Sequence, residues 1–506
     1  DSDNGYQWPN EIRRNRDVDS RPCLTMNLIR QHNKNISNEA RKNKASPKVV
    51  GTGNGATEDS AACFRDLIRH VEVISNAQTA YTIARGWQID GGIGWWRVVT
   101  DYAGFDTFDQ EAFIRPVNDP LSVYMDPDIQ QIDGSDARFA FVFDNVPRDE
   151  IEESYPEYKN QLLGVNPMGV GSGDTDWVNK RNVRICEYFR KEMVPDVLVS
   201  FMYEGSRKTL LRSQLPENIF EAVMAAPLTK SRETQTEVIE WYLIVGEQVI
   251  DRTVWPGKFI PLVRVIGEEI VIEGILDRKG HTRNQKDPQR MFNYNASSQV
   301  EFVALQSKTP WLAPSAAIEE YETMWNTANV VNHSVLVYNA FDDDGTPRPT
   351  PTRQGPPNAS PAFQVGMDTA FNQMMMVSGQ WQNQMGMQGN ERTGKAIDLR
   401  QQQSATSVFH FQDNYEVGLR FTATILIDLL PRLYDTRRVI SILADDGTTF
   451  DVEIDPALKE AFVARQAANG EIVRRIFNPS IGKYSVAPSV GPAYGTKREE
   501  ARDALS

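Results

Sequence analysis

Cysteine and histidine are scarce in this 506-residue chain, and their scarcity excludes several kinds of site. The three cysteines, Cys23, Cys63 and Cys186, are too few and too widely spaced for a disulfide framework or a Cys-x-x-Cys metal knuckle. The five histidines are scattered without ligand spacing, and no serine elbow or Cys/His pattern of an activated nucleophile is present. The sequence therefore predicts no metal site, no cofactor and no catalytic centre, in a protein of a reducing compartment.

Long hydrophobic runs are also missing. The longest candidate for a membrane span, residues 421–430, is too short to cross a bilayer and contains Asp428. No signal peptide is evident, and neither is an initiator Met. We therefore expect no membrane partner, and we expect the chain to be part of a longer protein.

Acidic residues outnumber basic ones, 68 to 54, which gives a formal net charge of −14. Hydrophobic residues make up 40% and charged residues 24%, a balance typical of a globular protein with room for several domains. An acidic chain does not grip nucleic acid over its whole surface, although it can let nucleic acid pass.

The first half of the chain predicts two helices followed by a region rich in strands. Asp19-Ser20 and Pro22 predict the start of one helix, and a second helix is expected from Thr57 to Gly86. Glycines within residues 87–102 predict a strand, a tight turn and a second strand. Further strands are expected at residues 139–143, 183–188, 198–203, 238–245, 260–266 and 270–275. The fold class is α+β.

The second half is mainly helical. Asp287 as a cap and Pro288 predict a helix start, residues 308–312 interrupt the helix, and proline-rich residues 341–361 cannot continue it. Helix returns at Ala362. Helical spacing without proline then extends from Thr393 to Leu430, so a helix over 393–435 would span roughly 64 Å. A strand pair at 439–443 and 450–454, a helix from Pro456 and a capping box at Thr496 complete the prediction.

Several motifs have an ordinary structural explanation that we favour. Gly389 to Lys395 fits G-x-x-x-x-G-K, but Ala396 replaces the Ser or Thr that holds Mg²⁺ and no strand precedes it. Residues 51–55 and 169–173 are expected to be glycine-rich surface loops, and acidic residues 126–136 a turn between strands. Met374, Met375 and Met376 are expected to fill a helix face, whereas Met385 and Met387 suit an adaptable surface.

Eight short motifs, in order along nearly the whole chain, carry a resemblance to a known family. They are Gly5-Tyr-Gln-Trp8, Arg21-Pro-Cys-Leu-Thr-Met-Asn27, Gly92-Ile-Gly-Trp-Trp-Arg-Val98, Val123-Tyr-Met-Asp-Pro127, Asp133-Gly-Ser-Asp-Ala137, Lys286-Asp-Pro-Gln-Arg290, Gly394-Lys-Ala-Ile397 with Arg400-Gln-Gln-Gln403, and Gly491-Pro-Ala-Tyr-Gly-Thr-Lys-Arg498. The chain resembles the portal proteins of tailed double-stranded DNA phages, in the large form found in short-tailed phages.

The resemblance implies an α+β wing, a helical stem with an inserted clip, a long spine helix and the start of a helical crown. The implied ranges are wing 1–285, first stem helix 286–308, clip 309–361, second stem helix 362–380, tunnel loop 381–392, spine helix 393–435, returning wing elements 436–495 and crown start 496–506.

It also implies a ring, commonly of twelve subunits, at one capsid vertex of the virion, assembled in the host cytoplasm. Implied partners are DNA passing through the channel, the terminase large and small subunits, capsid and scaffolding proteins, and a tail adaptor. The residues expected to meet DNA at the tunnel loop are Gln382, Gln384, Arg392 and Lys395, and the expected stem residues are Lys286, Asp287 and Arg290. Two alternatives stay open: another structural or connector protein of a virion, and a packaging ATPase using the Gly389–Lys395 near-match.

Overall fold

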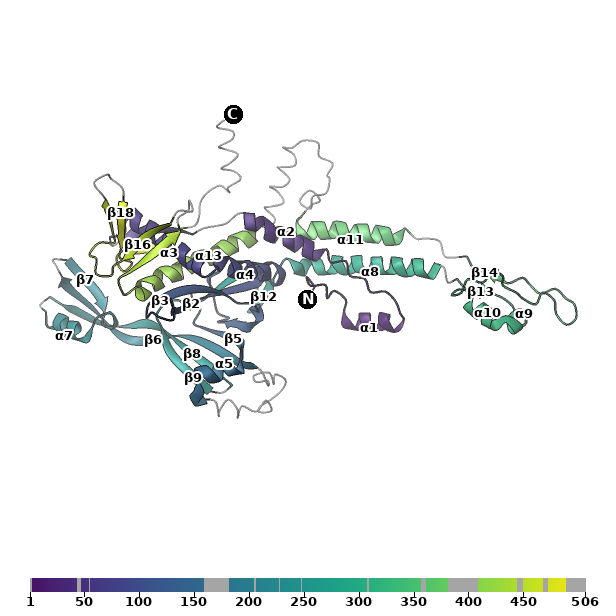
Figure 1. Cartoon of the computed structure of the whole chain (residues 1–506), viewed down its shortest axis with the longest axis horizontal. Coiled ribbons are helices and arrows are strands. Elements are labelled where there is room, and N and C mark those ends of the chain that lie inside the picture. The colour runs from purple at the N-terminus through teal and green to yellow at the C-terminus, as the bar shows by residue number, and fades with distance from the viewer. Residues whose placement is uncertain are drawn as a thin grey trace, which may run out of the picture. The chain divides into compact units, whose positions relative to one another are not determined.

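The computed structural model describes residues 2–42, 47–53, 55–158, 182–203, 206–226, 228–246, 248–306, 309–355, 361–380, 408–443, 449–466 and 472–487. The chain divides into two compact units. Figure 1 labels the helices and strands of both. The first contains Asp1–Glu39 and Lys279–Phe409, and the second contains Ala40–Arg278 and His410–Ser506. The mixed α+β class is confirmed. The expected wing over 1–285 included the N-terminal residues. In the structure Asp1–Glu39 belong to the helical unit instead, because this part of the chain lies along a helix of that unit.

A three-stranded sheet covered by three helices forms the core of the second unit. The sheet has the order β10 (Leu262–Ile266), β2 (Ile93–Tyr102), β3 (Gln110–Pro116), all antiparallel. Its helices are α3 (Glu58–Ile74), α4 (Ala77–Gly91) and α13 (Phe409–Leu433). Trp96 is fully buried among them and donates its indole N–H to Thr422 on α13 at 2.8 Å. Apolar residues at helical spacing on α13 thus pack on alternate residues of β2.

The expected strand, turn and strand over 87–102 is wrong. Helix α4 continues through Gly91, and Gly92 ends it with φ +92°, so these glycines form a helix end instead of a hairpin turn. A single strand follows. Its Gly94 is required, because a Cβ there would lie 1.8 Å from the carbonyl oxygen of Ala84. The two helices expected as one over 57–86 are α3 and α4, separated at Asn76, which has φ +48°.

A larger antiparallel sheet follows in the same unit. Its order is β4 (Val123–Met125), β5 (Phe139–Pro147), β6 (Asn182–Tyr203), β8 (Lys230–Val245), β9 (Gln248–Trp255), and β7 (Ser206–Leu211) pairs with β6. The expected strands at 183–188 and 198–203 are both parts of β6, because Pro195 and Asp196 do not interrupt the pairing with β8. Helices α5 (Arg148–Ser154) and α7 (Glu217–Ala225) and short β11 (Glu268–Ile272) and β12 (Ile275–Lys279) complete this region.

The C-terminal part of the unit is a mixed sheet of order β15 (Arg438–Leu443), β16 (Thr449–Ile454), β18 (Ile472–Phe477), β17 (Phe462–Gln466). The expected pair β15–β16 is confirmed. The prediction of a helix from Pro456 is wrong, because the chain turns there and then enters β17. The side-chain amide of Asn478 stabilises this turn by donating to the carbonyls of Pro456 and Leu458. The glycine-rich stretch from Gly51 is partly strand, because β1 (Lys48–Gly53) pairs with β19 (Lys483–Ala487).

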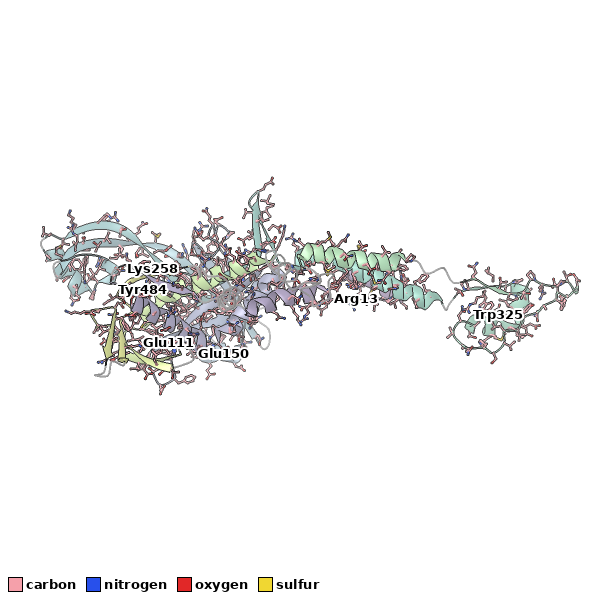
Figure 2. The ribbon with its side chains drawn as sticks, turned by 90° about the horizontal axis from the view of Figure 1, so that it is seen from above. Arg13, Glu111, Glu150, Lys258, Trp325 and Tyr484 are labelled. Atoms are coloured by element: carbon pink, nitrogen blue, oxygen red, sulfur yellow. The ribbon has the colours of Figure 1, made fainter. Side chains whose placement is uncertain are left out.

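The first unit contains two long helices, α8 (Thr282–Gln306) and α11 (Ala362–Ser378), and two near the N-terminus, α1 (Asn10–Val18) and α2 (Ile29–Lys42). Between α8 and α11 lie β13 (Trp311–Leu312), α9 (Ser315–Ile318), α10 (Glu322–Thr327) and β14 (Thr352–Arg353). Figure 2 shows Trp325 within this inserted segment. The interruption after 306 and the return of helix at Ala362 are confirmed.

Two expected helix starts in this unit are wrong. The helix expected from Asp19 is absent: α1 ends at Val18, Ser20 has φ +53°, and helix resumes only at Ile29. The start expected at Asp287 lies inside α8, which begins at Thr282 and carries Pro288 internally. Of the long helix expected over 393–435, the described part is α13, and residues 393–407 lie outside the described ranges.

Candidate functional site

Helices α8 and α11 form an antiparallel hairpin. Phe302 near the end of α8 meets Phe363 near the start of α11, with ring centroids 6.0 Å apart. Gly366 allows close approach, because a Cβ there would lie 2.7 Å from the side chain of Asn295. The face of α11 turned to α8 carries buried Ala370, Met374, Met375 and Ser378. The prediction that the methionines fill a helix face is confirmed for Met374 and Met375, whereas Met376 is 67% exposed.

Another side of α8 holds the N-terminal arm, residues 2–28, through its backbone. The N–H of Leu24 donates to Ser297 Oγ at 2.9 Å, that of Met26 to Asn293 Oδ1 at 3.0 Å, and that of Leu28 to Gln289 Oε1 at 2.9 Å. Two residues of extended chain span roughly 6.6 Å and four residues of helix roughly 6 Å, so the two repeats match. Residues 24–28 of the arm therefore run antiparallel to α8, with every second amide satisfied by a helix side chain.

Charged and aromatic contacts reinforce the arm. Glu301 on α8 binds two arm guanidinium groups, Arg16 at 3.2 Å and Arg21 at 2.8 Å, and it raises the pKa of Arg21. Arg16 is almost fully buried and lies 5.5 Å from the ring centroids of both Trp8 and Tyr294. Gln7 accepts from Asn293 Nδ2 at 2.6 Å. Three of the motifs that carry the family resemblance, at residues 5–8, 21–27 and 286–290, therefore contribute residues to the contact between the arm and α8.

The residues of α8 that hold the arm were missed by the sequence analysis. They are Gln289, Asn293 and Ser297, each fully or almost fully buried, together with Glu301. A signal was present, since these polar residues recur every fourth position and therefore lie along one side of a helix. The apolar pattern of the segment does not report them, because a buried polar stripe leaves no mark on it.

Two histidines that are far apart in sequence meet where α2, the start of α8 and the end of α11 converge. The ring nitrogen Nε2 of His281 lies 3.0 Å from the carbonyl oxygen of Ser378, and Nδ1 lies 2.9 Å from Asn33 Oδ1. His32 is fully buried, its Nδ1 lies 3.3 Å from Gln380 Oε1, and its carbonyl accepts from Gln380 Nε2. Burial lowers the pKa of His32 to about 4, and the neighbouring His281 acts in the same direction. These surroundings therefore stabilise the neutral form of the His32 imidazole.

The predicted stem residues lie together on the surface of α8. Lys286, Asp287 and Arg290 are all exposed, and Arg290 pairs with Asp287 at 3.4 Å, one turn away. Helix α11 carries a single charged residue, Asp368, among its seventeen residues. The predicted tunnel-loop residues Gln382, Gln384, Arg392 and Lys395 lie outside the described residues, and so do the Gly389–Lys395 near-match, Met385, Met387 and the capping box at Thr496.

The inserted segment has its own small core. The Trp311 and Trp325 rings meet edge to face, with centroids 5.4 Å apart, and Arg353 lies over Trp311 at 5.6 Å. The indole N–H of Trp325 donates to the carbonyl of Val337 at 2.8 Å. Arg348 donates to the carbonyl of Ala316 at 2.7 Å and pairs with Asp342. These contacts tie the two ends of the segment to each other.

The acidic residues 126–136 form turns between β4 and β5, as expected. Asp126 accepts from the Arg138 guanidinium at 2.7 Å, which lowers the pKa of this carboxyl to about 2. Asp136 accepts the backbone N–H of Gln130 at 2.8 Å. Within the described ranges, no group of three or more His, Cys, Asp or Glu side chains could hold a metal ion. No described helix is both long and apolar enough to cross a membrane.

The described residues show long packed helices, a bound arm and an inserted small subdomain. A family model for phage P22-like portal proteins matches residues 2–506, and the chain belongs to this family. It is similar to the portal protein of Acyrthosiphon pisum secondary endosymbiont phage 1, with 24% identity over 505 residues that cover 96% of this chain and 68% of that relative. The protein is therefore a virion component of a tailed phage, with a portal role as head-tail connector.

Proposed function

We propose that the chain forms a closed ring, of about twelve copies, whose α8–α11 hairpins surround a channel for double-stranded DNA. The observation that carries this proposal is the family match over residues 2–506 together with the two-helix hairpin that holds an inserted segment at its end. Portal proteins form oligomeric rings. The number of subunits and the place of the hairpin along the channel are part of this proposal.

The charge distribution on the hairpin supports this role. A channel that binds phosphates tightly would slow DNA, since each contact displaces counterions and adds affinity. The chain carries a net charge of −14, α11 has one acidic and no basic residue, and Arg290 on α8 is already paired with Asp287. Such a surface passes a polyanion with few attractive contacts.

We also propose a role for the segment inserted between α8 and α11 and a role for the segment that follows α11. The inserted segment, residues 309–361, is the clip that docks the terminase motor and later the tail adaptor. The segment after α11 contributes Gln382, Gln384, Arg392 and Lys395 to the DNA contacts. Capsid and scaffolding proteins would contact the wing, and assembly would take place in the host cytoplasm.

The test is native mass spectrometry of the purified full-length chain together with an image along the symmetry axis. The expected result is a closed ring of roughly a dozen copies, with a hole wide enough for a DNA duplex. A ring without an axial hole, or a flat lattice, would contradict the channel and favour another structural role in the virion.

A further inference from the structure

The hairpin of β11 and β12 exposes the apolar side chains near its tip. These two strands form a small sheet of their own. The exposed fractions of its apolar side chains lie between 42% and 72%, for Ile270, Val271, Ile272, Ile275 and Leu276. Single exposed aliphatic residues are ordinary on a protein surface, whereas a contiguous group of them marks an interaction site.

The hairpin is held in one conformation at both ends. Its turn consists of Glu273 and Gly274, which have φ of +52° and +77°. Positive φ at both central residues is the two-residue turn whose twist suits a hairpin. At the base, Arg278 Nε donates to Glu269 at 2.9 Å, and the buried Arg264 of β10 lies 3.4 Å from the same carboxylate. The apolar tip is therefore presented on a braced support.

One face of the hairpin is turned away from this ion pair. A two-residue turn pairs Ile272 with Ile275 and, three pairs further on, Glu269 with Arg278. The contact between Glu269 and Arg278 agrees with this register. Side chains alternate between the two faces along each strand, so the isoleucines lie on the face opposite Glu269. We call this the isoleucine face, and it consists of Ile270, Ile272 and Ile275.

A pocket of about 370 Å³ lies between the N-terminal arm and α8. Its apolar wall is formed by Trp8, Pro9, Ile12, Met291 and Tyr294. Ile12 and Tyr294 are about half exposed, so the mouth of the pocket is apolar too. Among the described lining residues, Arg290 is the one that carries a charge. Pockets of this size and character accept one or two apolar groups together with a polar partner.

We propose that the isoleucine face of one copy docks in this pocket of a second copy of this chain. Portal proteins form oligomeric rings, so each subunit has neighbours. The hairpin and the pocket are different surfaces, and a contact between different surfaces is the kind that generates a closed ring. This inference rests on the ring proposed above, and it names one contact that would join its subunits.

The charges beside the two surfaces are complementary as well. Glu273 is exposed at the hairpin tip, next to Ile272, and Arg290 is exposed beside the pocket. Arg290 already pairs with Asp287 at 3.4 Å, but a guanidinium has several N–H donors and can bind a second carboxylate. Such a pair would add little affinity at the rim and would fix the orientation of the docked hairpin.

The first test compares the two faces of the hairpin in the full-length chain. Ile272→Ser/Ile275→Ser removes two side chains from the isoleucine face, and Val271→Ser/Leu276→Ser removes two from the other face. All four positions are exposed, so the Tm of the dissociated subunit should not change. Native mass spectrometry should show that the first variant needs at least tenfold more protein to assemble and that the second does not. Equal assembly of the two variants would overturn the proposal.

Disulfide crosslinking identifies the occupant of the pocket. In a chain whose Cys23 is replaced by serine, the other two cysteines are buried. Ile272→Cys or Ile275→Cys, each combined with Ile12→Cys, should give a ladder of linked chains when isolated rings are mildly oxidised. Val254→Cys combined with Ile12→Cys is the control, because Val254 is exposed on β9, and it should give no ladder.

The crosslinking outcomes separate this contact from the ring itself. An intact ring without links would overturn the docking and leave the channel proposal standing. Links confined to single chains would also overturn it, because each hairpin would then fill the pocket of its own chain. A wild-type chain that never assembles would overturn the ring, and the contact with it.

Charge reversal tests the polar part of the contact. Glu273→Arg and Arg290→Glu should each raise the protein concentration needed for assembly by about tenfold, and the double variant should recover much of the loss. Glu233→Arg is the control, because Glu233 is exposed on β8 and should have no such effect. Additive losses in the double variant would overturn the pairing of Glu273 with Arg290, and with it the assignment of this pocket.

Discussion

The backbone N–H of Met26 donates to Oδ1 of Asn293 at 3.0 Å, across 267 positions of sequence. Asn293 is 1% exposed, and its Nδ2 donates in turn to Gln7. One amide side chain thus holds two separate points of the arm against α8. Because Gln7 and Asn293 are both buried, this end of the arm is held as part of the unit that contains α8.

Replacing this amide should release the arm. Asn293→Leu leaves the Met26 N–H and Gln7 Oε1 without partners, and the buried Gln7 oxygen alone costs about 1–3 kcal/mol when it is unsatisfied. The expected result is a corresponding loss in the free energy of opening at the Met26 amide, measured by hydrogen exchange. Asn284→Leu is the control, because Asn284 is exposed on the same helix. Equal effects of the two substitutions would show that Asn293 does not hold the arm.

Gly94 should not tolerate a methyl group. Gly94→Ala places Cβ within 1.8 Å of a backbone oxygen of α4, so strand or helix must move, at about 3 kcal/mol or more. Gly86→Ala is the matched control, because it lies inside α4 with nothing within 4 Å of an added Cβ. That change should stabilise the protein by about 0.5–1 kcal/mol. Thermal denaturation checks both, and equal shifts of Tm would be inconsistent with the packing of β2 on α4.

His32 should make stability depend on pH. Its folded-state pKa is about 4, below the ordinary 6.5, so the unfolded chain takes up the proton first as pH falls. The stabilisation is complete above pH 6.5 and is lost as pH falls towards 4, by about 3 kcal/mol. His32→Asn keeps a donor near Nδ1 but cannot titrate. The measurement is Tm against pH for both proteins, and parallel curves would contradict a buried neutral His32.

Neutralising Arg392 and Lys395 together should change DNA packaging or retention without changing ring assembly. Both residues are proposed to meet DNA after α11, and each lost phosphate contact lowers the salt dependence of binding. Packaged DNA per ring is compared between the wild type and the Arg392→Gln/Lys395→Gln variant at several salt concentrations. If assembly fails while packaging per ring stays normal, these residues have a structural role instead.

Much of the fold could be predicted from sequence where the pattern was local. The strand pair β15–β16, the end of α8 and the start of α11 follow from alternation and proline, and the structure confirms them. The error at residues 19–28 has a cause that no local pattern could reveal. Leu24 and Leu28 have helical apolar spacing, but the amides of Leu24, Met26 and Leu28 are satisfied by α8, about 270 positions away. No local pattern reports such a partner.

The site was predicted in part for a similar reason. Lys286, Asp287 and Arg290 were placed on a stem helix, and they lie on the surface of α8. Gln289 and Asn293 were passed over, although they are buried and hold the arm. Charge indicates a surface function, whereas a neutral amide becomes informative only when its partner is known.

The geometry of the arm also determines how it would respond to force. Its hydrogen bonds to Ser297, Asn293 and Gln289 lie side by side along α8. A pull along the arm loads all three bonds in shear, and they must break together. A pull that lifts one end breaks them one after another. The arm therefore resists tension along the stem far better than peeling, and mechanical work done along the helix axis would leave it attached.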